Sequence, residues 1–354
     1  MNSVNTRLLA VLSVFISSAI IILACADGDD YPNNRINQDV FIPAKYRILG
    51  FSYNAYNWNY NDDISTAINQ ENISDWYAYL NQSISEETLF KVVYSDSLKD
   101  IEQALNGIKS TEKHYTRQFA FYNYLKLAKR SETYANAYYD WWSENPRPNQ
   151  ERDAYALNKE IESAFLQAND DFMKGKYWFQ WVRNLYFQKK YNESIALYDK
   201  YAAKFNGLTA WRALGYKAAS IYKQGRFSES NRMYAQQLVS RPGAIHSVHF
   251  SYHPLEMDAF LELVNGVKSV QEKVALWMLQ GTYTDEVASS EAIYALDPNS
   301  EYLELLLGRL LSIADNGNEF PRELDIPRAI RLYERIILEG KRKEVNKIKT
   351  GLAY

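Results

Sequence analysis

Along most of this chain, hydrophobic and polar positions alternate with the period of an α-helix. Between residues 111 and 130, for example, Tyr115, Phe119 and Tyr122 recur at steps of four and three, which places their rings on one face of a helix. A serine followed three residues later by an acidic residue marks a helix start, because each side chain can hydrogen-bond the backbone N–H of the other. Three such pairs are Ser83 with Glu86, Ser97 with Asp100, and Ser269 with Glu272. The chain is therefore expected to be all-α.

The second half of the chain repeats itself at an offset of 36 residues. The segment "WFQWVRNLYFQKKYNESIALYDKYAAKF" aligns with the segment "LGYKAASIYKQGRFSESNRMYAQQLVSRP". The matched residues include Tyr191 with Phe227, Ser194 with Ser230, and Tyr198 with Tyr234. A two-helix unit of this length is typical of stacked helical repeats, in which small residues lie at close helix crossings and rings fill the groove between pairs.

These residues resemble the tetratricopeptide repeat. Trp178, Trp181 and Leu185 stand where the family has large residues in its first helix, and Ser194 stands at a small position of the second. The resemblance implies a right-handed α–α solenoid of helix pairs over residues 150–354. An irregular solenoid is expected, because three residues are larger than the family's usual choice: Val182, Tyr201 and Gln237.

The N-terminus carries an apolar segment of a different kind. One basic residue, Arg7, precedes sixteen apolar or small residues from Leu8 to Leu23, fewer than the roughly 20 that span a bilayer. This pattern predicts an export signal over residues 1–24. The tetrapeptide "ILAC", which ends at Cys25, resembles a bacterial lipobox, in which the signal is cut before the cysteine and the thiol is acylated. A plain secretory signal with an incidental cysteine is the alternative.

Cysteine usage favours the lipid anchor. Cys25 is the only cysteine in the chain, so it has no partner for a disulfide within the chain, and a free thiol outside the cell would be reactive. The acidic tract "DGDD" after it resembles the surface-export signals of Bacteroidetes-type outer-membrane lipoproteins. We therefore expect an outer-membrane lipoprotein, with outward exposure slightly favoured over a simple solvated tether.

The segments between the signal and the repeats are less regular. The expected organisation is a signal peptide at 1–24, an acidic and asparagine-rich tether at 25–40, an extended aromatic arm with helices at 41–144, and helical repeats at 150–354. The run "NPRPN" at 145–149 forms the boundary, since proline interrupts helices. An apolar helical pattern is still running at Tyr354, so the repeat array is expected to be incomplete at its C-terminal end.

A wider resemblance covers most of residues 25–340. The segments "NISDWYAYL", "ALGYKAASIYKQGRF" and "KVALWMLQGTYTDE" are similar to those of long Bacteroidetes-type repeat lipoproteins of the outer membrane. That group supplies a cellular location and a fold, and it implies no activity.

Composition adds one bias. The chain is 47% hydrophobic and 23% charged with a formal net charge of −3, which indicates neither disorder nor a nucleic-acid-binding surface. It holds 29 Tyr and 8 Trp, rings that suit contact with a partner because they bury a large area and lose little rotamer entropy. The candidate partner-binding residues are Trp58, Tyr60, Trp178, Trp181 and Trp211.

Candidate chemistry is sparse. His246, His249 and His253 lie close in sequence with Glu256, and imidazoles with a carboxylate can bind a divalent metal. However, no H-E-x-x-H motif is present and Pro254 interrupts the helix that would align them, so packed histidines in a helix connector are the favoured interpretation. The sequence has no G-x-S-x-G elbow and no glycine-rich phosphate loop, so neither catalysis nor a cofactor is expected.

Three functions remain open. The leading hypothesis is a lipid-anchored, non-catalytic repeat scaffold that binds a protein partner at the outer membrane. The second is a surface glycan-binding lipoprotein of a sugar-uptake system, with Trp58 and Tyr60 as an aromatic platform. The third, and least favoured, is a metal-dependent hydrolase that uses the histidine cluster.

Overall fold

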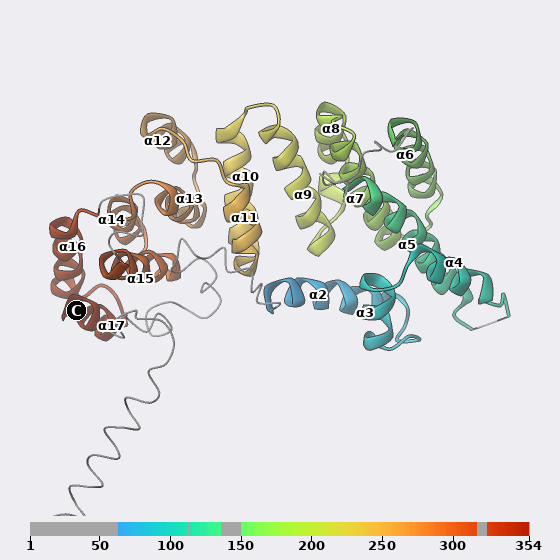
Figure 1. Ribbon diagram of the computed structural model, residues 1–354, viewed down its shortest axis with the longest axis horizontal. Coiled ribbons are helices and arrows are strands. Elements are labelled where there is room, and N and C mark those ends of the chain that lie inside the picture. Colours follow the sequence, from blue (N-terminus) through green and yellow to red (C-terminus); the bar gives the residue numbers. More distant parts are fainter. Residues whose placement is uncertain (1–62, 112, 136–149, 317–323, 354) are drawn as a thin grey trace, which may run out of the picture. The chain divides into compact units, whose positions relative to one another are not determined.

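Helices account for all the regular secondary structure that was found. The structure is a computed structural model that describes residues 63–111, 113–135, 150–316 and 324–353 (Figure 1). Within these ranges it contains sixteen α-helices, two short 3-10 helices and no strand. The prediction of an all-α fold is therefore confirmed for the described residues. The signal segment, Cys25, the tether, Trp58, Tyr60 and the break at 145–149 lie outside the described residues.

Within each described range, successive helices are joined by connections of at most seven residues. The first five are α2 (Asp63–Tyr79), α3 (Glu86–Tyr94), α4 (Leu98–Gly107), α5 (Tyr115–Ala135) and α6 (Gln150–Gln167). Next come α7 (Asp171–Phe187), α8 (Tyr191–Tyr201), η4 (Ala202–Lys204), α9 (Gly207–Tyr222), α10 (Phe227–Ser240), η5 (Pro242–Ala244), α11 (Ile245–Ser251) and α12 (Met257–Gly266). The last five are α13 (Val270–Tyr283), α14 (Glu286–Leu296), α15 (Glu301–Asn316), α16 (Ile326–Glu339) and α17 (Val345–Ala353).

Sequence neighbours pack against each other in pairs. The helix α7 packs on α8, α9 on α10, α13 on α14, and α16 on α17. Alternate helices also touch, so that α7 contacts both α5 and α9, and α13 contacts α15. In addition, α2 reaches residues far along the chain, because it packs against α9 and η5 as well as α3.

Two of the three predicted helix starts agree with the structure. At α4, Ser97 and Asp100 form the full capping box, with the Ser97 N–H donating to Asp100 Oδ2 at 2.9 Å and the Asp100 N–H donating to Ser97 Oγ at 3.3 Å. At α13, Ser269 Oγ accepts from the N–H of Glu272 at 3.2 Å.

The third predicted cap, and the start of the helix expected from residue 111, differ from expectation. Glu86 is the first residue of α3, and the cap is Ser85, whose Oγ accepts from the Thr88 N–H at 3.3 Å, so the expected Ser83 cap was wrong. A cap must directly precede the helix, which Ser85 does and Ser83 does not. The helix expected from residue 111 begins at Tyr115, four residues later.

The repeat positions lie where two helices cross closely. Ser194 is fully buried, and its Oγ donates to the carbonyl of Val182 at 3.1 Å, which joins α8 to α7. The large Gln237 is accommodated because Gly215 faces it on α9: a Cβ at Gly215 would lie 2.9 Å from Gln237 Nε2. The two helices then exchange hydrogen bonds, from Gln237 Nε2 to the Trp211 carbonyl at 2.9 Å and from Trp211 Nε1 to the Gln237 carbonyl at 3.0 Å.

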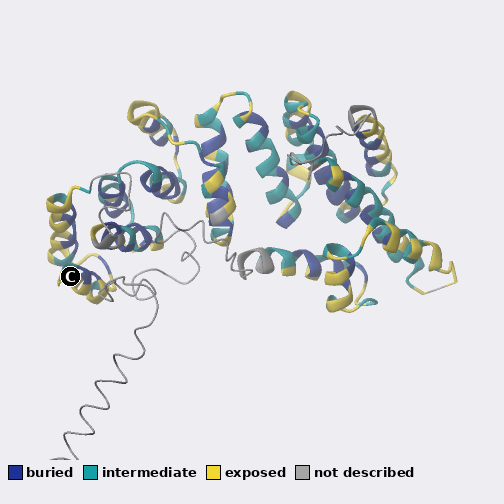
Figure 2. Ribbon diagram, in the orientation of Figure 1, coloured by how far each residue is buried: buried dark blue, intermediate teal, exposed yellow. Residues whose placement is uncertain are grey.

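An aromatic core joins α2 to α5 and α7. Trp76 is 1% exposed, and its ring centroid lies 4.8 Å from Phe121, 5.1 Å from Tyr124 and 5.0 Å from Phe172. Ten of the 17 residues of α7 are buried (Figure 2). Because α7 is covered by α2, α5, α6, α8 and α9, it is the central helix of this half of the chain.

Among the described helices, none combines the length and the hydrophobicity that crossing a membrane requires.

Candidate functional site

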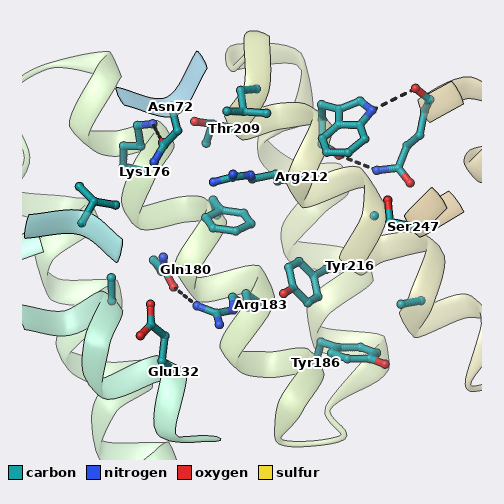
Figure 3. A pocket seen from close by; sticks show the side chains of 18 of the residues that line it. Asn72, Glu132, Lys176, Gln180, Arg183, Tyr186, Thr209, Arg212, Tyr216 and Ser247 are labelled. Carbon is teal, nitrogen blue, oxygen red and sulfur yellow. Dashed lines mark hydrogen bonds between the residues drawn. The ribbon is translucent and has the colours of Figure 1, made fainter. Parts of the chain in front are cut away.

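A cavity of about 530 Å³ lies between seven helices that fall within residues 63–251 (Figure 3). Its walls come mainly from α5, α7 and α9, with further residues from α2, α3, α10 and α11. This volume falls within the range of typical ligand sites, and the lining mixes rings with polar and charged groups, as such sites do.

The rings come from several helices and are held in place by one another. The ring centroid of Tyr216 on α9 lies 5.9 Å from that of Phe179 and 5.5 Å from that of Tyr186, both on α7. Among the described residues, no partner lies within hydrogen-bond distance of the Tyr186 and Tyr216 hydroxyls. The cavity therefore offers positioned rings with two hydroxyls that remain available to a ligand.

One wall holds a buried cation. Lys176 on α7 is only 4% exposed, and its ammonium donates to Asn72 Oδ1 at 3.0 Å and lies 3.8 Å from Asp75 Oδ2. The same ammonium lies 5.0 Å from the ring centroids of both Trp76 and Phe172. Cation–π attraction and the hydrogen bond partly offset the loss of hydration.

Burial changes the acid–base chemistry of this lysine. The pKa of Lys176 is lowered to about 8, chiefly because burial removes the ammonium from water; the nearby Arg212 guanidinium acts in the same direction, and Asp75 and Glu71 oppose the shift. Near neutral pH the side chain still carries its charge, at a free-energy cost to the folded state.

Two arginines face the same cavity. Figure 3 shows Arg212 extending from α9 toward the side of the cavity where Lys176 and Asn72 lie. Arg183 Nη1 donates to Gln180 Oε1 at 3.3 Å, and Gln180 Nε2 donates in turn to the Tyr124 hydroxyl at 3.0 Å. Within the part of the chain that the structure describes, no carboxylate forms an ion pair with Arg183 or Arg212.

The lining contains little that catalysis could use. Glu132 is the one carboxylate among the described lining residues, and it lies 3.6 Å from Lys129 Nζ. No histidine or cysteine occurs among those lining residues, so none of the described lining side chains supplies an imidazole or a thiolate. The arrangement is suited to binding an anionic or polar ligand.

The three described tryptophans that were predicted to bind a partner lie in different environments. Trp211 lines the cavity. Trp178 has no exposed surface and donates from Nε1 to the Leu197 carbonyl at 3.2 Å, so it belongs to the core between α7 and α8 and not to a contact surface. Trp181 is half-buried, with its ring 6.0 Å from Phe165, and does not line the cavity.

The histidines have separate partners. His249 stacks on Tyr283 with centroids 4.5 Å apart, and its Nε2 lies 3.0 Å from Thr282 Oγ1. His253 stacks on Phe227 with centroids 3.7 Å apart. The side chain of His246 lies outside the described ones, and the described side chains include no group of three or more His, Cys, Asp or Glu that could hold a metal.

The charged residues of the cavity were not predicted from the sequence, although the sequence contains a pattern that relates two of them. Lys176 and Arg212 are separated by 36 residues, the offset of the internal repeat. They therefore occupy the same repeat position, on α7 and on α9. The occurrence of a basic residue at the same position of both repeats, on helices rich in aromatic residues, could have marked both as candidate binding residues.

Comparisons with known protein families, with characterised proteins and with solved structures find no match for this chain.

The cost of burying Lys176 leads to a prediction about stability. The folded chain binds this proton more weakly than the unfolded chain, whose lysine titrates near 10.4, so stability rises with pH between about 8 and 10.4. At pH 7 both states are protonated and the full cost remains. We expect Lys176→Met to raise the free energy of unfolding at pH 7 by about 2 kcal/mol, after allowance for the lost hydrogen bond to Asn72.

Urea unfolding followed by circular dichroism at pH 7 and pH 10 measures this effect. The increase in the free energy of unfolding caused by Lys176→Met should shrink toward zero at pH 10, because Lys176 is then neutral in the folded wild-type protein. Lys159→Met, at an exposed position of α6 outside the cavity, is the control and should change little at either pH. Equal destabilisation by Lys176→Met at both pH values would contradict the account.

Proposed function

We propose that this chain is a non-catalytic binding protein that holds an extended segment of a protein partner in the cavity. In this proposal the helix pairs form an irregular right-handed solenoid of tetratricopeptide type, and acylated Cys25 ties it to the outer membrane. The observation that carries the proposal is that α5, α7 and α9, which contact one another in succession, all contribute to one cavity.

The dimensions support a chain segment as the ligand. Neighbouring packed helices lie about 8–10 Å apart, so three of them span roughly 16–20 Å. An extended chain rises about 3.3 Å per residue, so five or six residues match this span. Rings such as Tyr216 offer apolar surface to side chains of the segment, and the hydroxyl of Tyr186 can bond its backbone.

The second candidate is a glycan ligand. Its supporting observation is the combination of rings with hydroxyls and amides in one lining, since sugars stack their C–H faces on rings and hydrogen-bond through hydroxyls. Trp211 and Tyr216, from one face of α9, would take the place of the platform expected from Trp58 and Tyr60.

The membrane anchor rests on the N-terminal sequence. Sixteen apolar or small residues, Leu8 to Leu23, are followed by the small Ala24 and then by the lone Cys25. Each buried acyl methylene contributes about 0.8 kcal/mol, so several chains hold a soluble domain firmly on a bilayer.

Acylation can be tested in the native envelope. We expect the wild-type protein to incorporate a labelled fatty acid and to sediment with membranes. Cys25→Ala should abolish both, because the thiol that accepts the lipid is gone. An unlabelled wild-type protein that remains in the soluble fraction would exclude the anchor.

Site-specific photocrosslinking tests the binding site. A photoreactive amino acid in place of Tyr216, inside the cavity, should give a discrete crosslinked protein band in intact cells. The same replacement at Tyr155, which is 52% exposed on α6 and outside the cavity, is the matched control and should give none. Equal crosslinking at both positions, or none at Tyr216, would argue against a partner in the cavity.

A further inference from the structure

The two repeats place a cation at the same position of adjacent helices. Lys176 and Arg212 are 36 residues apart, matching the repeat offset, and both line the cavity. Since α7 and α9 pack directly on each other, equivalent positions on the two helices face the same space. Figure 3 shows the Arg212 side chain directed toward the wall that holds Lys176.

The cavity has the opposite charge to the chain as a whole. The formal net charge of the chain is −3, whereas the described lining residues include four basic side chains and one acidic one. The basic residues are Lys129, Lys176, Arg183 and Arg212. The acidic one, Glu132, lies beside Lys129, which leaves the other three without a lining carboxylate.

The surrounding contacts leave Arg212 without a competing partner and Lys176 only partly neutralised. Lys176 Nζ donates to Asn72 Oδ1, and its ion pair with Asp75 Oδ2, at 3.8 Å, is longer than a hydrogen bond, while the Asp75 side chain is 39% exposed. Among the described residues, Arg212 has neither an ion-pair nor a hydrogen-bond partner. A guanidinium offers a planar fork of donors that matches a carboxylate, and charge-assisted hydrogen bonds of this kind are about twice as strong as neutral ones.

We propose that the cavity selects its partner segment by acidic side chains, with a carboxylate held between Lys176 and Arg212 and a second one near Arg183. This inference rests on the proposed function, because it specifies the chemistry of the segment that the cavity holds. Because Lys176 is buried, its attraction to a bound carboxylate is screened less than that of a cation in open solvent.

The spacing of the cations adds a constraint on the segment. Lys176 and Arg183 are seven residues apart on α7, two helical turns, so they lie roughly 10 Å apart along the helix axis. Residues on one side of an extended segment recur about every 6.6 Å. Acidic residues two to four positions apart in the segment therefore suit the two cationic points.

The test selects ligands without prior bias. A phage-displayed library of random heptapeptides is enriched on the full-length protein in detergent, and in parallel on Arg212→Gln. Binders to the wild-type protein should be enriched in Asp and Glu relative to the unselected library, and Arg212→Gln should lose this enrichment. Arg232→Gln is the matched control, because Arg232 on α10 is half-exposed and outside the lining.

Selected peptides are then synthesised and measured by calorimetry. Replacing their acidic residues by the corresponding amides should weaken binding at least about tenfold, as should Arg212→Gln, while Arg212→Lys should retain part of the affinity. Synthesis with a free and with an amidated C-terminus distinguishes side-chain from terminal carboxylates. Thermal melting confirms that each variant is folded.

The outcomes separate this inference from the proposed function. Peptides that bind without acidic enrichment, or that are indifferent to Arg212→Gln, would leave the partner-binding proposal standing and overturn the acidic selection. Failure to enrich any peptide would overturn both. Binding of a galacturonic acid trimer through Arg212, with no peptide binding, would assign the cavity to an acidic saccharide and would also overturn both.

Discussion

The burial of Trp76 is the contact on which the cavity depends. Its indole packs against rings from both α5 and α7, and the ammonium of Lys176 lies over it. Each aromatic pair contributes about 1 kcal/mol beyond the area that it buries. This ring, the stacking of Tyr79 on Phe172 and the Asn72–Lys176 hydrogen bond hold α2 against α7, so the docking of Trp76 helps to place the α2 wall of the cavity.

A second constraint sets the direction of Arg212. The missing side chain of Gly215 lets α10 approach α9 closely enough for Trp211 and Gln237 to exchange two hydrogen bonds. This exchange fixes the rotation of α9 about its axis, and Arg212 follows Trp211 directly in the chain. Packing between two helices of one pair thus determines which way a charged side chain of the cavity points.

Part of this arrangement could be predicted from local sequence. The cap formed by Ser97 and Asp100 depends on residues three apart, and the buried Ser194 follows from the repeat, so both patterns carried enough information. The choice between Ser83 and Ser85 at α3 did not, because two serines near a helix start give competing caps and the sequence does not separate them.

The cavity itself depends on contacts that no local pattern encodes. Asn72 and Lys176 are 104 residues apart, and only the docking of α2 brings them together. Trp178 and Trp211 are both large residues on first helices, yet Trp178 is buried against α8 of its own pair whereas Trp211 lines the cavity. Periodicity predicts that such rings lie on a buried face, but not what covers that face.

Amide hydrogen exchange tests most directly whether docked α2 forms part of the folded unit. If Trp76 anchors this helix, the amides of residues 73–80 should exchange as slowly as those of the buried centre of α7, through the same unfolding event. Exchange of residues 73–80 at the unprotected rate, while α7 remains protected, would show that α2 is not docked and would remove one wall of the cavity.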